Sequence, residues 1–170
     1  DGRGREAIWD SMQRKETYGT SGDRILLWFD LISEDKVVPM GGEIETSVNP
    51  SFRIKAVGAF KQKPGCPDYS STSLSSEDLE LICKNECYNP SDERKIISRI
   101  EVIKIIPQVN INEDVANLIL DPWKVFDCPN NQLGCSITFS DEDFSFNKRD
   151  TSYYVRAIQE SSPTINSENI

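Results

Sequence analysis

The first residues that could do chemistry form a small, hydroxyl-bearing turn near the start of the chain, Thr20-Ser21-Gly22. Two arginines, Arg14 and Arg24, flank it in the sequence. Guanidinium groups beside small hydroxyls are suited to holding an anion such as phosphate or carboxylate. The competing interpretation is that the basic residues only complement a helix dipole and keep the surface soluble. These five residues are the candidate substrate-binding set.

Other familiar catalytic groups are excluded or weak. The chain contains no histidine, so it cannot form a histidine-based nucleophilic dyad or a histidine-ligated metal site by itself. The acidic run Asp141-Glu142-Asp143 offers oxygen ligands for Ca²⁺ but lacks the spacing and glycine of an EF-hand loop. A solvated acidic turn is the favoured interpretation of that run. The three tryptophans, in apolar surroundings, are expected in the core.

Five cysteines lie in polar, turn-rich sequence: Cys66, Cys83, Cys87, Cys128 and Cys135. Cysteines in such loops indicate disulfides and therefore an exported protein. A zinc site is disfavoured, because histidine is absent and the spacings are C-x3-C and C-x6-C. Cys128 and Cys135 flank an expected hairpin loop, where a bridge is sterically reasonable. The other three cannot be paired from sequence, and the odd number suggests a thiol partner outside the chain.

Bulk properties exclude several classes of function. The 170 residues carry a net charge of -9, and the basic residues are scattered rather than clustered. Nucleic acid is therefore not an expected partner. No apolar run reaches the length of a membrane-spanning helix. The first residues show neither an initiator Met nor a signal peptide, so we expect the chain to be cut from a longer protein.

Periodicity predicts one helix followed by six or seven strands, which is typical of an antiparallel β-sandwich. The expected helix covers residues 5–16. The expected strands are 24–32, 51–60, 96–107, 124–126, 135–141 and 151–159, with one or two short edge pieces between 33 and 51. Residues 61–95 form a cysteine-bearing excursion with a short helix at 76–84, capped by Ser76. Residues 161–170 are a polar tail.

Several stretches together resemble one known family. They are "REAIWDSMQRKETYGTSGDRILLWFDL", "VGAFKQKPGCPDY", "CYNPSDERKIISRIEVIKIIPQ", "DPWKVFDCP" and "RDTSYYVRAIQE". In this order they resemble the DUF3604 family of bacterial proteins, within the PHP-like (polymerase and histidinol phosphatase) metallohydrolases near the CehA/McbA group. Two positions depart from the family: Gly4 stands in place of a helix-capping Thr, and Asp23 in place of Pro. The Asp23 carboxylate would oppose Arg24 in holding an anion.

The resemblance implies that the chain is the C-terminal portion of such a protein. Residues 1–23 would be the last helix and strand of a (β/α) barrel, and residues 24–160 an appended β-rich, sandwich-like domain. The implied partners are the missing N-terminal barrel and a small-molecule or phosphoester substrate. A divalent metal (Mn, Zn or Fe) would be bound by ligands preceding residue 1, with none in this chain.

Two classes of function therefore remain open. One is a fragment of an exported, metal-dependent, phosphoesterase-like hydrolase that is periplasmic or secreted and inactive alone. The alternative is a non-catalytic, disulfide-stabilised β-sandwich that binds a ligand or has a structural role. The feature that separates them is what precedes residue 1. An upstream barrel sequence supports the hydrolase, whereas a signal peptide directly before residue 1 supports the module.

Overall fold

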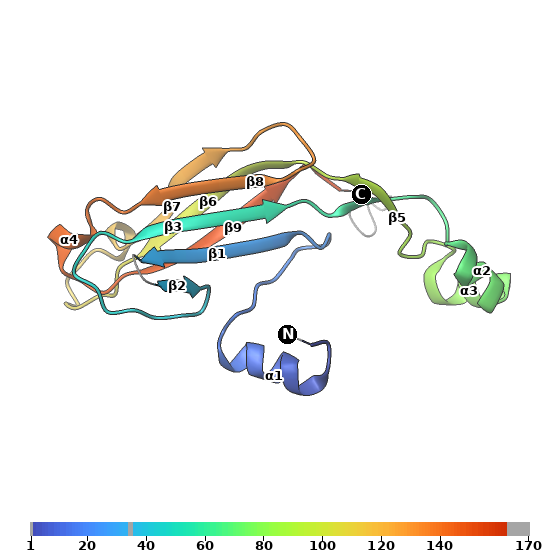
Figure 1. Ribbon diagram of the computed structural model, residues 1–170, viewed down its shortest axis with the longest axis horizontal. Coiled ribbons are helices and arrows are strands. Elements are labelled where there is room, and N and C mark those ends of the chain that lie inside the picture. The colour runs from blue at the N-terminus through green and yellow to red at the C-terminus, as the bar shows by residue number, and fades with distance from the viewer. Residues whose placement is uncertain (1, 34–35, 163–170) are drawn as a thin grey trace.

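The computed structural model describes residues 2–33 and 36–162 and is mainly β, with all strand pairs antiparallel. One sheet has the order β2-β1-β3-β8 and a second the order β7-β6-β9 (Figure 1). The strands of the first sheet are β1 (Leu26–Ser33), β2 (Lys36–Pro39), β3 (Ser51–Val57) and β8 (Cys135–Ser140). Those of the second are β6 (Ile97–Ile105), β7 (Ile119–Asp127) and β9 (Ser152–Gln159). Within the described ranges neither sheet closes into a barrel, which confirms the mainly β, antiparallel prediction.

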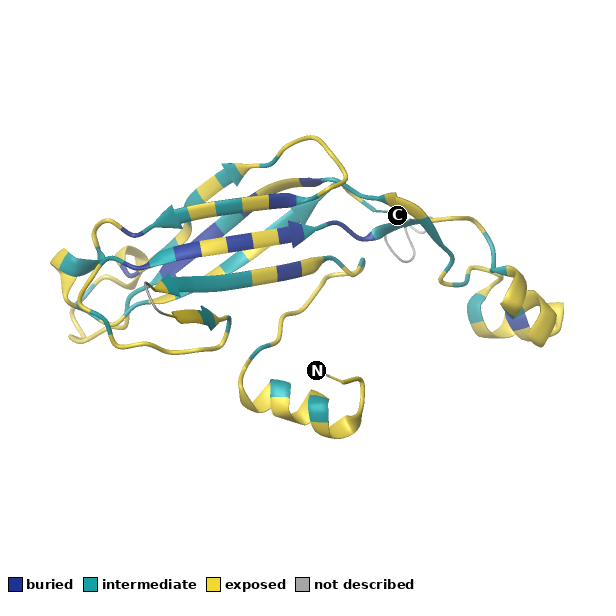
Figure 2. Cartoon of the chain, in the orientation of Figure 1, coloured by how far each residue is buried: buried dark blue, intermediate teal, exposed yellow. Residues whose placement is uncertain are grey.

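The two sheets share one apolar core because their strands alternate inward and outward side chains. In β3, Phe52, Ile54 and Ala56 are buried, whereas Arg53 and Lys55 between them are exposed (Figure 2). The buried cluster combines residues of both sheets: Leu27, Ile54, Ala56 and Cys135 from the first, and Ile97, Ile100 and Val102 from the second. The sheets therefore pack face to face, as in a sandwich.

Aromatic rings strengthen this contact between the layers. The ring of Phe52 lies 5.5 Å from Phe29 and 5.2 Å from Phe139, both in its own sheet. It also lies 4.6 Å from Tyr153 of β9 in the opposite sheet. Trp123 of β7 reaches across to Phe139 at 6.1 Å. Phe52 and Phe139 of the first sheet are thus the rings at which the two layers meet.

Close backbone packing ends the third strand earlier than predicted. The expected strand 51–60 stops at Val57, because Gly58 lies against the backbone of Lys95. A Cβ at Gly58 would overlap the carbonyl oxygen of Lys95, so the close approach needs glycine. The chain continues as β4 (Phe60–Gln62), which pairs with β5 (Pro90–Arg94) in a separate two-stranded ribbon.

This ribbon leads to a helical arm, α2 (Asp68–Ser73) and α3 (Ser76–Cys83), which projects away from the two sheets (Figure 1). Leu79 is the one residue of these two helices that is buried. The predicted helix 76–84 is confirmed as α3, but its cap is Ser75 rather than Ser76. The Ser75 hydroxyl accepts from the Asp78 N–H, and the Asp78 side chain accepts from the Ser75 N–H, which is a capping box.

The remaining elements are short. The helix α1 (Arg5–Gln13) ends before the predicted residue 16, because Lys15 adopts a left-handed conformation with φ 59°. A 3-10 turn, Val115–Asn117, precedes β7, and α4 (Phe144–Asn147) precedes β9. None of the helices in the described part of the chain is long and apolar enough to cross a membrane. Most of the expected polar tail, residues 163–170, lies outside the described residues.

The predicted Cys128–Cys135 disulfide is present, but its setting differs from the expected hairpin. Cys128 follows β7 and Cys135 begins β8, and these strands belong to different sheets. The bridge therefore ties the two layers together at one end, and Cys135 is part of the buried core.

Removing this bridge should destabilise the protein. Changing both Cys128 and Cys135 to Ala frees a loop with a sequence separation of 7 residues. Loop-closure entropy predicts a loss of about 2.5 kcal/mol in the free energy of unfolding. Urea unfolding followed by tryptophan fluorescence measures this loss. The control is Cys83→Ser, which also replaces a cysteine but keeps the Cys128–Cys135 bridge. A loss below about 0.5 kcal/mol, the range of a neutral surface change, would contradict the prediction.

Candidate functional site

The predicted substrate-binding turn is an exposed loop between α1 and β1. Thr20, Ser21 and Gly22 are all exposed, and Gly22 has φ 106°, a conformation that favours glycine. The Tyr18 hydroxyl closes the loop behind them by donating to the Ile25 carbonyl at 3.0 Å. The fold therefore presents the two hydroxyls together at the apex of a closed loop.

The two arginines that flank the turn have different surroundings. The Arg14 guanidinium pairs with Glu16 at 3.0 Å, and the hydrogen bond from Arg14 to Glu16 raises the pKa of Arg14 above its usual value. The Arg24 side chain is exposed. Among the interactions of the described residues, no hydrogen bond or ion pair links Thr20, Ser21 or Arg24 to another member of the predicted set. An anion at the turn remains a prediction.

Asp23, which follows the candidate turn directly, has its own structural partners. Its Oδ2 accepts from Lys95 Nζ at 2.6 Å and from Gln159 Nε2 at 2.9 Å, and the Ser162 hydroxyl donates to the same oxygen. The Lys95 hydrogen bond, followed by that of Ser162, holds the pKa of Asp23 below its usual value. Asp23 thereby fixes the start of the first sheet to the end of β9, and its charge is neutralised by Lys95 rather than set against Arg24.

Removing the charge of Asp23 should weaken the attachment of the first sheet to the end of β9. We expect Asp23→Asn to lower the free energy of unfolding by about 1.5 to 3 kcal/mol, the range for hydrogen bonds to charged groups. Asp30→Asn is the matched control, because Asp30 pairs at 2.8 Å with Arg53, whose side chain is 48% exposed, and such surface pairs contribute at most about 1 kcal/mol. Equal effects of the two variants in chemical denaturation would argue against an anchoring role for Asp23.

A buried ionic group lies between the sheets, and one of its members, Asp141, belongs to the acidic run that the sequence predicted to be solvated. Asp141 is 0% exposed and Lys104 is 3% exposed. Lys104 Nζ forms an ion pair with Asp141 Oδ2, and the Tyr153 hydroxyl donates to that oxygen at 2.6 Å. The Asp143 N–H donates to Asp141 Oδ1 at 3.1 Å. The expectation of a solvated acidic turn is therefore wrong for Asp141, whose carboxylate faces the core.

The partners of this carboxylate decide its protonation state. Burial raises the pKa of Asp141, but the hydrogen bonds from Lys104, Tyr153 and the Asp143 N–H together lower it below its usual value. Burial and the hydrogen bond to Asp141 raise the pKa of Tyr153 well above the ordinary value for tyrosine. At neutral pH Asp141 is therefore a carboxylate and Tyr153 a neutral phenol. Since Asp141 and Lys104 are closed off from solvent, we expect this group to have a structural rather than a catalytic role.

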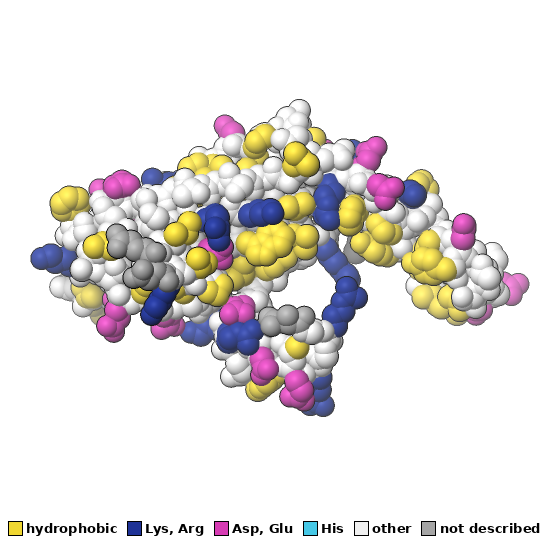
Figure 3. All heavy atoms as spheres, viewed as in Figure 1, with side chains coloured by type: hydrophobic (Ala, Val, Ile, Leu, Met, Phe, Trp, Pro, Cys, Tyr) yellow, Lys and Arg dark blue, Asp and Glu magenta, His cyan; other side chains and the backbone are white. Residues whose placement is uncertain are grey.

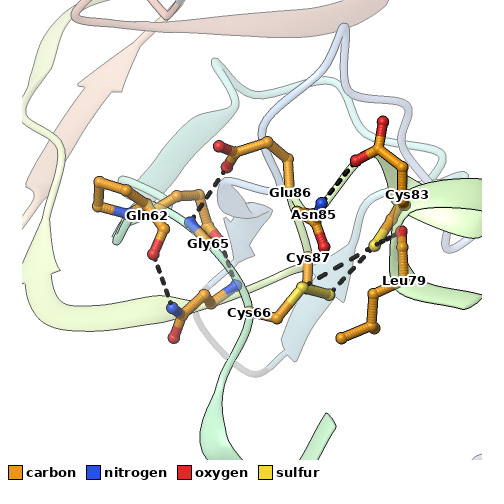
Figure 4. The surroundings of a disulfide bond; sticks show 11 residues. Gln62, Gly65, Cys66, Leu79, Cys83, Asn85, Glu86 and Cys87 are labelled. Atoms are coloured by element: carbon orange, nitrogen blue, oxygen red, sulfur yellow. Dashed lines mark hydrogen bonds between the residues drawn. A yellow bond between two sulfur atoms is a disulfide. The ribbon is translucent and has the colours of Figure 1, made fainter. Parts of the chain in front are cut away.

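Three cysteine sulfurs gather in the helical arm (Figure 4). Cys66 and Cys87 form a disulfide, and Cys83 is a free thiol whose sulfur lies 3.2 Å from that of Cys87 and 3.9 Å from that of Cys66. Within the described residues this is the one group of metal-ligating side chains close enough to share an ion. Two of its three sulfurs are consumed by the disulfide, and histidine is absent from the chain. These residues do not fit the hydrolytic Mn, Zn or Fe centre that the resemblance implies.

Apolar side chains are exposed on α1 and on the first sheet. Ile8, Trp9 and Met12 of α1 are 54%, 57% and 58% exposed. On the outer face of β1, Trp28 is 44% exposed, and Lys55 Nζ lies 5.5 Å from the centre of its ring. Figure 3 shows hydrophobic side chains bordered by basic ones on this side of the molecule. The prediction of core positions is therefore wrong for Trp9 and Trp28, and right only for Trp123, which packs against the core.

These features define the class of the protein: a two-layered, antiparallel β domain with two disulfides, a helical arm and an exposed amphipathic helix. The disulfides are compatible with an oxidising, extracellular environment. Residues 2–63 match the family model of DUF3604, a family described as proteins of unknown function. The matched segment runs from α1 through the candidate turn to the ribbon. Neither the curated proteins nor the solved structures yield a match.

Proposed function

We propose that this chain is the C-terminal portion of an exported, metal-dependent hydrolase of the PHP-like superfamily that acts on phosphoester or similar bonds. The observation that carries the proposal is α1, an amphipathic helix within the DUF3604-matched segment whose apolar face is exposed. In this proposal α1 is the last helix of a barrel formed by preceding residues and packs on the rest of it, and the turn at Thr20 to Gly22 lies on the rim of the barrel's site. The intact protein is periplasmic or secreted.

Helix energetics support a missing partner for α1. The helix has 9 residues, and isolated helices shorter than about 12 to 15 residues are marginal in water. Its large apolar side chains, Ile8, Trp9 and Met12, are more than half exposed. Full burial of side chains of this kind contributes about 1.5 to 3 kcal/mol each. A covering surface would therefore stabilise α1 substantially, which is the role we assign to the barrel.

The roles proposed for this chain are limited to its own side chains. The Thr20 and Ser21 hydroxyls would donate hydrogen bonds to an anionic group of the substrate, with Arg24 or Arg14 toward the leaving anion. The divalent metal would belong to the barrel, because Cys66, Cys83 and Cys87, the one close group of metal-ligating side chains in the described part of the chain, do not fit it. Residues 1–170 alone should therefore show no turnover of a chromogenic phosphoester with Mn²⁺ or Zn²⁺, and robust turnover would refute the proposal.

A sharper test uses the complete polypeptide encoded by the reading frame. Trp9→Glu should lower its melting temperature, since it places a charge in the proposed interface, whereas Asp10→Asn on the opposite helix face should not. The double change of Thr20 and Ser21 to Ala should lower kcat/KM without changing the melting temperature. A signal peptide directly before residue 1, or equal melting temperatures for Trp9→Glu and Asp10→Asn, would contradict the proposal.

The second candidate is a non-catalytic, disulfide-stabilised sandwich that binds a ligand or has a structural role. The exposed Trp28 with Lys55 beside its ring favours it, because indole side chains are enriched at protein interfaces. In that case Trp28→Ala should abolish ligand binding by residues 1–170. The hydrolase proposal assigns no role to Trp28 and therefore predicts no such loss.

A further inference from the structure

The fold brings a free thiol against a disulfide in the helical arm. Cys83 is the last residue of α3, and its thiol donates to the Leu79 carbonyl one turn back at 3.2 Å. Its sulfur lies 3.2 Å from the Cys87 sulfur, closer than an ordinary non-bonded sulfur contact. The Cys66 sulfur is 3.9 Å away. Figure 4 shows the three side chains converging from two different segments.

A tight turn after α3 is responsible for this proximity. Lys84 and Asn85 are both left-handed, with φ 54° and 59°. The Glu86 N–H donates to the Cys83 carbonyl at 2.8 Å, which closes the turn. Left-handed conformations are unfavourable for residues other than glycine, so the turn is held by its surroundings. It returns the chain so that Cys87 lies beside Cys83.

We propose that Cys66, Cys83 and Cys87 form a thiol–disulfide exchange centre in which one disulfide moves between two pairings that share Cys87. The Cys83 thiolate attacks the Cys87 sulfur, the Cys83–Cys87 bond forms, and the Cys66–Cys87 bond breaks. Cys66 leaves as a thiolate and takes up the proton that Cys83 gave to solvent. No net oxidation or reduction occurs, so the step needs no other reactant.

The direction of attack defines the movement that the step requires. A thiolate attacks a disulfide along the extension of the breaking bond. The Cys83 sulfur lies close to both bridged sulfurs, so it is beside the bond rather than on its extension. Side-chain rotation at Cys83 and Cys66 brings the three sulfurs into line. Such rotation is permitted here, because all three side chains are only partly buried and lie outside the sandwich core.

The two pairings present different thiols to solvent. Cys66 lines a shallow pocket together with Gly65, Leu74, Leu79 and Asn85. The Cys83 thiol instead points back to the helix carbonyl of Leu79. Exchange therefore transfers the free thiol from the end of a helix to the edge of an open pocket, where an external disulfide can reach it.

A metal site is the weaker explanation of the same cluster. It would need all three sulfurs as thiolates, whereas two of them form a disulfide and the residues described supply no fourth ligand within reach. Exchange starts from the Cys66–Cys87 disulfide and the free Cys83 thiol, both of which are present in the structure. It is also independent of the proposed hydrolase function, because it concerns the arm alone.

Alkylation of the free thiol tests the exchange directly. The unreduced chain is treated with N-ethylmaleimide at pH 7 for increasing times, digested below pH 6 to prevent scrambling, and mapped by mass spectrometry. We expect adducts on both Cys66 and Cys83, with Cys128 and Cys135 unmodified as an internal control. Modification confined to Cys83 at every time point would overturn the proposal.

Two matched variants give a second readout. Cys83→Ser should hold the Cys66–Cys87 bridge and leave no thiol to modify. Cys66→Ser should form a Cys83–Cys87 bridge in air, so that it also has no free thiol. Two free thiols in Cys66→Ser, with a near-ultraviolet circular dichroism spectrum like that of the unchanged chain, would show that the second pairing cannot form and would overturn the proposal.

Discussion

Replacing Asp141 by Asn should lower the free energy of unfolding by about 3 to 5 kcal/mol at pH 7, the range for breaking a buried ion pair. The change keeps the shape of the side chain but leaves the Lys104 ammonium, 3% exposed, without a counter-charge. It also weakens the acceptor for the Tyr153 hydroxyl. Urea denaturation followed by tryptophan fluorescence measures the loss.

Two further variants separate the ion pair from a general effect of substitution. Asp143→Asn changes an exposed carboxylate two residues away and should stay within about 0.5 kcal/mol of the unchanged protein. The double variant Lys104→Met, Asp141→Leu removes both charges and should recover most of the loss, because apolar replacement of a buried pair is often neutral or stabilising. A small effect of Asp141→Asn, matching that of Asp143→Asn, would show that the pair does not stabilise the fold.

The same pair sets a pH dependence with a definite sign. Because the pKa of Asp141 is lower in the folded state than its usual value, the stabilisation is fully present above the unfolded-state pKa of about 4. It is lost as the pH falls through the lower folded-state value. The stability difference between the unchanged protein and Asp141→Asn should therefore be constant near neutrality and shrink below about pH 4. A constant difference down to pH 2 would contradict this assignment.

Phe52→Ala should also lower the free energy of unfolding by about 3 to 5 kcal/mol, the range for removing a buried aromatic side chain. Phe52 is 2% exposed and contacts rings in both sheets, so the change leaves a cavity at the junction of the layers. Phe52→Leu fills most of that space, so we expect it to lower the free energy of unfolding markedly less than Phe52→Ala does. Thermal and urea unfolding of both variants test this, and indistinguishable losses would contradict the cavity explanation, because Leu keeps most of the bulk that Ala removes.

The sequence was most informative where apolar, β-branched residues are dense. The predicted strands 24–32, 96–107 and 151–159 are confirmed as β1, β6 and β9, and β6 is the central strand of its sheet, as its apolar residues on both faces indicated. The predicted strand 124–126 is the central part of the longer β7, which was missed because Pro122 interrupts the pattern. Proline is tolerated there because β7 is an edge strand.

Contacts between distant segments could not be predicted. Lys104 and Asp141 are 37 residues apart, and no local pattern pairs them. A signal did exist on one side: Lys104 continues the inward series of Ile100 and Val102 in β6, so its side chain had to find a buried partner. Asp141 carried no such signal, because it begins an acidic run that resembles a surface turn.

The candidate site was less predictable than the fold. The sequence placed Thr20 and Ser21 in one small turn, and the structure shows both of them exposed in one loop. Asp23 is held by Lys95, which lies between β5 and β6, and by Gln159 at the end of β9, and neither contact has a signature in the sequence. The position of Cys83 beside the Cys66–Cys87 bridge likewise depends on a turn whose left-handed residues are Lys and Asn rather than glycine.

The close packing of Gly58 against Lys95 has a consequence for local unfolding. Beyond this contact, the ribbon and the α2–α3 arm contribute no residue to the buried cluster shared by the two sheets. Amide hydrogens of the arm should therefore exchange with solvent through openings of lower free energy than global unfolding, whereas those of β3 and β6 should exchange only on global unfolding. The chain then comprises two cooperative units, and sulfur chemistry in the arm can proceed while the sandwich stays intact.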